Sequence, residues 1–339
     1  MNVSPSVTVL MTVYNGGRFL SEAVESILSQ GFRDYEFLIV DDASSDDGLA
    51  ILKSYAAKDD RIRLILNERN KGQTACLNQG LREARGVWIA RQDADDLSLP
   101  GRLECQWKAV QKTPALMIVG VNGWMIDEQG VCTGMIHVPL DEDGIRWSLP
   151  FRNPFIHAGV MFRRQWAEGH PLLYDEEFRI CQDWELWGRI LDHGGGINLP
   201  QRLVAYRHQE GSLSHRNLEK TRQETETITT RLWKKNFPSH SPDQDLLSSF
   251  REGIDVRQRR DFWRLYDGLS RGWEGKRTSQ AVAVHHFQAA GALGRKAPFS
   301  MIAEILKALV SDPFWTMKTI REGILHTRSI RTPKLSRTI

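Results

Sequence analysis

The chain has 339 residues, 41% of them hydrophobic and 26% charged, which is ordinary for a folded globular protein and excludes general disorder. The formal net charge of +3 is too small to indicate nucleic acid as a partner, and no segment interleaves basic and aromatic residues as RNA-binding sheets do. Four widely spaced cysteines form no C-x-x-C pair. They predict neither a zinc site nor a disulfide framework, and they fit a reducing, cytoplasmic compartment.

The first 120 residues alternate short apolar runs with amphipathic helical patterns. We expect strands at 7–13, 37–40, 62–66 and 87–90, and helices at 19–28, 49–55, 73–85 and 102–110. Repeated strand–helix units require right-handed crossovers, so they predict an α/β fold with a mostly parallel, doubly wound sheet. In such sheets ligands bind beyond the carboxyl ends of the strands. The polar residues that follow the strands are therefore the candidate site.

The pattern changes after residue 116. Gly and Pro become frequent up to about residue 165, which predicts β-rich excursions, and a helix at 183–191 ends at three glycines. From 216 to 325 the pattern is helical and charged, and residues 326–339 form a basic tail that we expect to be disordered. The predicted division is an α/β domain at 1–215, a helical C-terminal region and this tail.

Two acidic clusters directly follow predicted strands, Asp41-Asp42 and Asp93-Ala94-Asp95-Asp96. The simple alternative is helix capping, since Ser44 and Ser98 precede the next helices. Carboxylates this close repel one another, and a divalent cation removes the conflict. Oxygen ligands at this spacing suit Mg²⁺ or Mn²⁺ bound to phosphate oxygens. The second cluster thus predicts a diphosphate–metal site, and Asp42 a hydrogen bond to a base or a ribose.

Other ligand-binding motifs are missing. The chain has neither G-x-G-x-x-G nor G-x-x-x-x-G-K-S/T, which disfavours dinucleotide oxidoreductases and P-loop NTPases. It also has no His-x-x-x-His pair of a zinc enzyme. The N-terminus lacks a signal-peptide pattern, and no apolar run of about eighteen residues predicts a membrane span.

Several ordered motifs together resemble family 2 glycosyltransferases with the A-type nucleotide-sugar (GT-A) fold. They read VTVLMTVYN at 7–15, SILSQ at 26–30, EFLIVDDASSD at 36–46, NKG at 70–72 and DADDLSLPGR at 93–102. The resemblance covers residues 6 to about 215. It implies that residues 1–215 are a GT-A catalytic domain, with a nucleotide-sugar half at about 1–120 and an acceptor half at about 121–215.

The resemblance also implies roles for single residues. The nucleotide-sugar site is expected at Thr12, Tyr14, Asn15, Asp42, Asp93 and Arg207. Asp93 and Asp95 match the D-x-D element that binds Mn²⁺ or Mg²⁺, with Asp95 the more direct ligand. The Glu-Asp motif of the family reads Gln182-Asp183 here, so Asp183 matches the catalytic base although the preceding Glu is absent. His157 and Trp184 are weighed as acceptor contacts, against loop solvation and core packing.

The activity implied by the resemblance is inverting, metal-dependent transfer of one sugar from a UDP-, GDP- or dTDP-sugar. The expected acceptor is a hydroxyl of a glycan or lipid-linked glycan in bacterial surface polysaccharide or glycolipid synthesis. A missing Q-x-x-R-W motif favours single addition over polymerisation. A catalytically silent nucleotide-sugar-binding scaffold and a sugar nucleotidyltransferase are the alternatives.

An amphipathic stretch at 299–325 leaves two hypotheses open. It docks on the catalytic domain or on a second subunit of a homo-oligomer, as such stripes usually do. Alternatively, together with the basic tail, it attaches the protein peripherally to the inner, cytoplasmic face of the membrane.

Overall fold

The computed structural model describes residues 4–209 and 217–236. The described residues form two compact units. The first contains residues 4–136, 155–209 and 217–224, and the second contains residues 137–154 and 225–236. The amphipathic stretch at 299–325 and the basic tail at 326–339 lie outside the described residues, so the hypotheses about membrane and subunit contacts stay predictions.

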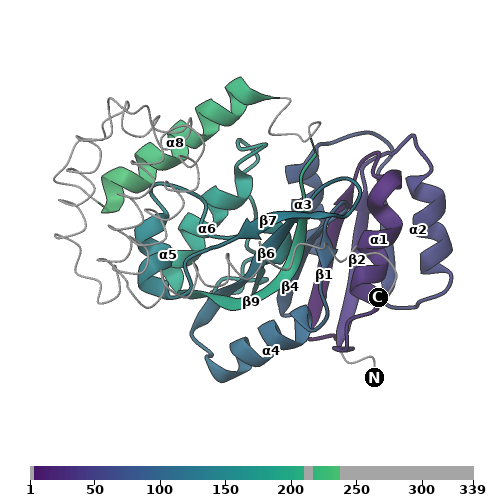
Figure 1. Cartoon of the computed structure of the whole chain (residues 1–339), viewed down its shortest axis with the longest axis horizontal. Coiled ribbons are helices and arrows are strands. Elements are labelled where there is room, and N and C mark those ends of the chain that lie inside the picture. The colour runs from purple at the N-terminus through teal and green to yellow at the C-terminus, as the bar shows by residue number, and fades with distance from the viewer. Residues whose placement is uncertain (1–3, 210–216, 237–339) are drawn as a thin grey trace. The chain divides into compact units, whose positions relative to one another are not determined.

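A mixed β-sheet forms the centre of the first unit (Figure 1). Its strands are β1 (Val7–Val13), β2 (Tyr35–Asp41), β3 (Ile62–Leu66), β4 (Trp88–Asp93), β5 (Leu97–Ser98), β6 (Leu116–Ile126), β7 (Cys132–Ile136), β8 (Met161–Arg163) and β9 (Gly195–Arg207). Their order is β3-β2-β1-β4-β8-β6-β9-β5, and β7 pairs with β6. The first four strands in this order are parallel, as the repeated strand–helix units predict. Beyond β4 the sheet is mixed, because β8 is antiparallel to β4 and β6, whereas β9 is parallel to β6.

Helices cover both faces of this sheet, so it is doubly wound. They are α1 (Gly17–Leu28), α2 (Gly48–Ala56), α3 (Gln73–Glu83), α4 (Arg102–Lys112) and α6 (Gln182–His193), and a 3₁₀ turn, η1, spans His157–Gly159. Residues Val9 and Met11 of β1 share one apolar cluster with residues of α1, α2 and α4. The opposite face contacts α3, where Gly80 packs directly on Leu10. All five helices overlap the predicted helical segments.

The described part of the second unit consists of helices and of irregular segments beside them. It contains α5 (Glu142–Ser148) and the greater part of α8 (Leu218–Asn236). The side chain of Asp141 caps α5 by accepting a hydrogen bond from the Gly144 N–H at 2.9 Å. The ring of Phe151 packs on Trp147 and Trp233, with centroid distances of 5.5 and 5.8 Å. Helix α5 thus interrupts a segment that the sequence predicts to be β-rich.

Candidate active site

The carboxyl ends of β2, β1 and β4 lie side by side at one edge of the sheet. In the register, Thr12 of β1 is opposite Asp93 of β4, and Val13 is opposite Asp41 of β2. The Asp42 N–H donates to the Val13 carbonyl at 2.8 Å, which continues the pairing beyond the strand. The acidic strand ends predicted from the sequence therefore share one edge.

Asp42 is buried and fixes the loop between β3 and α3. Its carboxylate accepts hydrogen bonds from the N–H groups of Lys71 at 2.9 Å and Gly72 at 2.8 Å, and from the Asn67 amide at 3.0 Å. Burial would raise the pKa of Asp42, but these hydrogen bonds outweigh it and lower the pKa below its ordinary value. Gly72 has a φ of +89°, a conformation that favours glycine, which accounts for the glycine of the N-K-G motif.

Of the two residues that follow β1, Asn15 bonds to the protein, whereas Tyr14 is exposed to solvent. Asn15, at a φ of +51°, donates its N–H to Ser44 Oγ at 3.0 Å, and its Oδ1 accepts the Ser45 N–H at 2.8 Å. Asn15 thus joins the loops that follow β1 and β2. The neighbouring Tyr14 is 55% exposed, so its ring is accessible to a bound molecule.

Asp93 ends β4 as part of a buried ionic cluster. Its Oδ1 accepts a hydrogen bond from Arg91 Nη2, and its Oδ2 lies 3.7 Å from His157 Nδ1. Burial would raise the pKa of Asp93, but the charges of Arg91, His157 and Arg102 outweigh burial and lower it. Asp93 is therefore an anion whose charge is already balanced by the protein.

Arg91 balances that charge from inside the sheet. Its side chain is fully buried, and its Nη1 donates to the carbonyl oxygens of Leu10 at 2.6 Å and Gln92 at 2.8 Å. Arg102 donates from Nη2 to the Arg91 carbonyl at 2.7 Å, and burial followed by the charge of Arg91 lowers the pKa of Arg102 to about 9. Arg91 is not among the residues predicted from the sequence, although a basic residue inside an apolar strand is a signal for it.

Asp95 and Asp96 differ from Asp93, because the charge of Arg207 does not outweigh their burial. Burial and then the charge of Asp93 raise the pKa of Asp95 to about 6, and its Oδ2 accepts a hydrogen bond from Gln209 Nε2 at 2.6 Å. Burial and the charges of Asp95 and Asp93 raise the pKa of Asp96 well above its ordinary value. The electrostatic conflict inferred from the sequence is therefore present, and it falls on Asp95 and Asp96.

A divalent cation fits this arrangement at Asp95, because it would balance a carboxylate near the strand end whose ionised form is disfavoured. Within the described ranges, no three His, Cys, Asp or Glu side chains gather into a ready-made metal cage. Mg²⁺ and Mn²⁺ commonly bind one or two carboxylates and complete their shells with phosphate oxygens and water. The donor set is of that kind.

Arg207 lies behind this turn, with its side chain only 1% exposed. Its guanidinium donates to Glu22 Oε2 and to the Asp95 carbonyl, both at 2.8 Å, and stacks 4.4 Å from the centre of the Phe19 ring. Its N–H donates to Asp96 Oδ1 at 2.7 Å. In this conformation Arg207 stabilises the D-x-D turn through its hydrogen bonds to Asp95 and Asp96, whereas the resemblance implied a contact with the nucleotide sugar.

The capping alternative for the second acidic cluster is wrong at Ser98. This residue belongs to β5, where its hydroxyl donates to Gln92 Oε1 at 2.5 Å and its N–H donates to Ser26 Oγ at 3.0 Å. The N-cap of α4 is Gly101, without a side-chain capping bond. Capping of α4 therefore does not explain the acidic residues.

His157 connects this edge to α6. Its Nε2 lies 3.2 Å from Arg91 Nε and 3.2 Å from the Tyr174 hydroxyl. Burial and then the charge of Arg91 lower the pKa of His157, against the opposing charges of Asp93 and Asp183. Since Arg91 donates to Nε2, the neutral ring carries its proton on Nδ1, which faces Asp93. The charges of Asp93 and Asp183 thus both act on His157.

Asp183 lies in the first turn of α6, where its Oδ1 accepts the Trp184 N–H at 2.7 Å. Gln182, which replaces the Glu of the family motif, is buried and donates from Nε2 to Gln73 Oε1 at 3.3 Å. Trp184 is 7% exposed, so the core-packing alternative fits its position better than stacking on a sugar.

Comparison with known proteins identifies the family. The model of glycosyl transferase family 2 matches residues 8–169. The protein EpsE of Bacillus subtilis is 39% identical over 222 residues, which cover 64% of this chain and 78% of EpsE. The O-antigen biosynthesis glycosyltransferase WbnJ of Escherichia coli is 30% identical over 216 residues, which cover 61% of this chain and 81% of WbnJ. The chain belongs to glycosyl transferase family 2.

A solved structure agrees with the fold of this family 2 glycosyltransferase. S. aureus TarS (residues 1–349), in complex with UDP-GlcNAc, superimposes with a TM-score of 0.54. The superposition covers 94% of this chain and 92% of that chain, at 15% sequence identity. The predicted GT-A fold is thereby confirmed.

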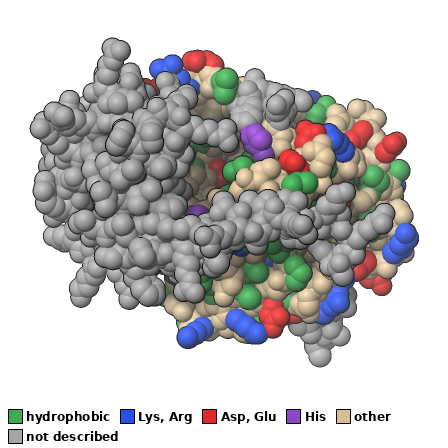
Figure 2. All heavy atoms as spheres, in the orientation of Figure 1, with side chains coloured by type: hydrophobic (Ala, Val, Ile, Leu, Met, Phe, Trp, Pro, Cys, Tyr) green, Lys and Arg blue, Asp and Glu red, His purple; other side chains and the backbone are tan. Residues whose placement is uncertain are grey.

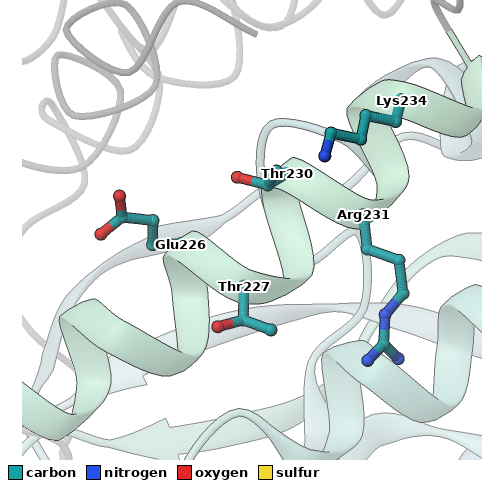
Figure 3. A pocket seen from close by; sticks show the side chains of 5 residues that line it. All are labelled: Glu226, Thr227, Thr230, Arg231 and Lys234. Carbon is teal, nitrogen blue, oxygen red and sulfur yellow. The ribbon is translucent and has the colours of Figure 1, made fainter.

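Two further observations concern other parts of this glycosyltransferase. Figure 3 shows an open pocket on α8 in the second unit, lined by Glu226, Thr227, Thr230, Arg231 and Lys234. All five side chains come from one helix, and none belongs to the predicted site.

Among the helices of the described part, none combines the length and the apolar character that crossing a bilayer requires.

Proposed function

We propose that this family 2 glycosyltransferase moves one sugar from a nucleotide-diphosphate sugar to an acceptor hydroxyl, with inversion at the anomeric carbon. The observation that carries the proposal is the joint placement of Asp93, His157 and Asp183, with Asp95 beside Asp93. One pair of carboxylates ends a strand of the nucleotide-sugar half, and the third begins a helix of the acceptor half. In this proposal the donor is bound by residues at the end of β4, and the acceptor is activated by a residue at the start of α6.

The donor occupies the strand edge in this proposal. The nucleoside contacts Thr12, Tyr14, Asn15 and Asp42, supported by the shared edge and by the exposed Tyr14 ring. Asp95, with Asp93 beside it, holds Mn²⁺ or Mg²⁺. Such a cation supplies electrostatic stabilisation of the charge that develops on the departing diphosphate.

The acceptor approaches from α6. Asp183 takes the proton of the attacking hydroxyl while the diphosphate leaves from the opposite face, so a single displacement inverts the configuration. His157, whose pKa is lowered and which lies beside Asp93, contacts the acceptor in this proposal. A glycan acceptor in bacterial surface polysaccharide synthesis is supported by the similarity to WbnJ, whose name places it in O-antigen biosynthesis.

The substitution Asp183→Asn tests the base. Removing a general base typically costs about 10²- to 10⁴-fold in rate, so transfer should be nearly lost while donor affinity stays within about twofold. Initial rates with a panel of UDP-, GDP- and dTDP-sugars, together with calorimetric titration of the donor, measure both. Asp192→Asn, the same change at an exposed position of α6, is the control. Equal losses of donor binding and of rate would contradict the assignment.

The reaction products decide between the proposal and its alternatives. A transferase releases a nucleoside diphosphate, whereas a sugar nucleotidyltransferase releases pyrophosphate. A silent scaffold binds the nucleotide with a metal but turns over no donor with glycan or lipid-linked acceptors. Chromatography of the nucleotide products distinguishes all three.

A further inference from the structure

The segment that leads into α6 lacks regular secondary structure from residue 172 to 181, yet it sets the place of Asp183. Helix α3 anchors its first part. Asn78 accepts the Tyr174 N–H at 2.8 Å and donates to the Tyr174 carbonyl at 2.9 Å. Thr74 Oγ1 donates to the Phe178 carbonyl at 2.9 Å. Between residue 178 and the contact of Gln182 with Gln73, these contacts with α3 leave residues 179–181 to another partner.

Glu224 anchors the last part. Its Oε1 accepts the N–H of Arg179, and its Oε2 accepts the N–H groups of Ile180 and Cys181, each at 2.9 Å. Glu224 is 6% exposed and belongs to the first turns of α8, within the same compact unit as α6. One buried carboxylate therefore accepts from three consecutive main-chain donors.

This contact holds the chain directly before α6. The first N–H groups of a helix need outside acceptors, and a Ser, Thr, Asn or Asp at the N-cap usually supplies one. The N-cap of α6 is Cys181, whose side chain does not cap the helix. A carboxylate is the favoured group at this end of a helix because of the helix dipole, and its bonds to N–H groups are charge-assisted. Of the three N–H groups that donate to Glu224, only that of Cys181 belongs to the N-cap of α6, so Glu224 supplies an acceptor and a negative charge at this end of α6 from a different helix.

We propose that Glu224 is a positioning residue for Asp183. It does not touch the substrate; it fixes the start of α6, so that the Asp183 carboxylate stays within reach of the acceptor hydroxyl. The inference rests on the proposed function, since it concerns the base assigned there. Misplacing a catalytic group by about 1 Å costs up to about a hundredfold in rate.

The test compares Glu224→Gln with Glu219→Gln in the full chain. Both changes remove one negative charge from α8, but Glu219 is exposed. In Glu224→Gln we expect faster hydrogen exchange at the amides of residues 179–181. We also expect kcat to fall by up to about a hundredfold, with donor affinity within about twofold of wild type. Glu224→Asp keeps the charge and should recover part of kcat, and Glu219→Gln should match wild type in every readout.

Two results would overturn the positioning role. One is unchanged exchange at residues 179–181 in Glu224→Gln, and the other is a wild-type kcat although those amides exchange faster. If Glu224→Gln does not fold, the same criteria apply to Glu224→Asp, with smaller expected changes. The two proposals fail separately, because normal transfer by Asp183→Asn overturns the base assignment and is independent of the exchange result.

Discussion

At the scale of single residues, one buried arginine makes the carboxylates at the end of β4 differ in pKa. Arg91 balances Asp93, whereas Asp95 keeps a pKa raised to about 6 by burial and by the charge of Asp93. A divalent metal suits Asp95, because burial and the charge of Asp93 disfavour its ionised form. Closely spaced acidic residues can therefore differ in pKa, and the difference comes from the buried residues that each of them contacts.

Asp95→Asn should consequently stabilise the protein without metal at neutral pH. The folded-state pKa of about 6 lies above the ordinary value of 3.8, so ionised Asp95 destabilises the folded state. This destabilisation grows as the pH rises from 3.8 to about 6, and it is fully present above that range. At pH 7.5 we expect the free energy of unfolding to rise by about 1–3 kcal/mol, with no gain below about pH 4. Urea unfolding in EDTA at both pH values measures this.

The same variant should lose metal-dependent transfer, so stability and activity move in opposite directions. Asp60→Asn, at an exposed position, is the matched control and should change neither. An Asp95→Asn variant that is less stable than wild type at pH 7.5 would contradict the electrostatic account.

The acidic residues of the site were predictable from the sequence, but their partners were not. Asp42, Asp93 and Asp95 belong to short motifs that directly follow apolar strands. The role of Arg91 depends on burial inside the sheet, which local sequence does not reveal. Glu224 contacts main-chain groups 43 to 45 residues away, and a contact with a backbone N–H leaves no pattern in the residue types.

At the scale of elements, local patterns predicted the strands and helices better than their pairing. Strands β1 and β3 begin and end at the predicted residues, because each is a mainly apolar run, interrupted by two threonines in β1 and by Arg63 in β3. The repeated strand–helix units also fixed the parallel half of the sheet. The pairing of β6 with β9 was not predicted, since it joins segments about 80 residues apart. No crossover rule of the N-terminal half applies to it.

Gly80→Ala tests the contact of α3 with β1. Alanine alone would favour the helix by up to about 1 kcal/mol. However, its Cβ would lie 2.3 Å from Leu10 Cδ1, and overpacking costs about 1–3 kcal/mol. We therefore expect a net loss of stability in urea unfolding. Combining it with Leu10→Ala should relieve the clash, so the two losses should not add; simple additivity would contradict a direct contact.

At the scale of the whole molecule, the family motifs and the fold class agree, and the proposed function puts the chemistry at one edge of the sheet of the first unit. On the face drawn in Figure 2, the described acidic and basic side chains are interspersed around that unit. The described charges on this face therefore form no patch of a single sign. The acidic residues of the candidate site gather instead at the strand ends. The organisation beyond residue 236 could not be argued from residue patterns alone, because helical periodicity does not say which surface a helix covers.

The last prediction concerns how metal and nucleotide bind together. Because the described residues offer carboxylates but no complete cage, the cation's remaining ligands should come from the diphosphate. Each ligand should then raise the affinity of the other by the same factor. We expect Mn²⁺ alone to shift the unfolding temperature little, and a nucleoside diphosphate with Mn²⁺ to shift it more than the two separate shifts together. At a ligand concentration of about 100 Kd the stabilisation is about 2.7 kcal/mol.

Differential scanning fluorimetry with UDP, GDP and dTDP, each in Mn²⁺ or EDTA, measures this coupling and identifies the base as well. In Asp95→Asn the extra shift caused by Mn²⁺ should disappear, while any shift caused by nucleotide in EDTA should remain, since Asp42 and Tyr14 are untouched. Equal nucleotide shifts in Mn²⁺ and in EDTA would contradict a metal shared between Asp95 and the diphosphate. Lowering the pH below about 6 should weaken the coupling in wild type, because Asp95 must lose its proton before it can bind a cation.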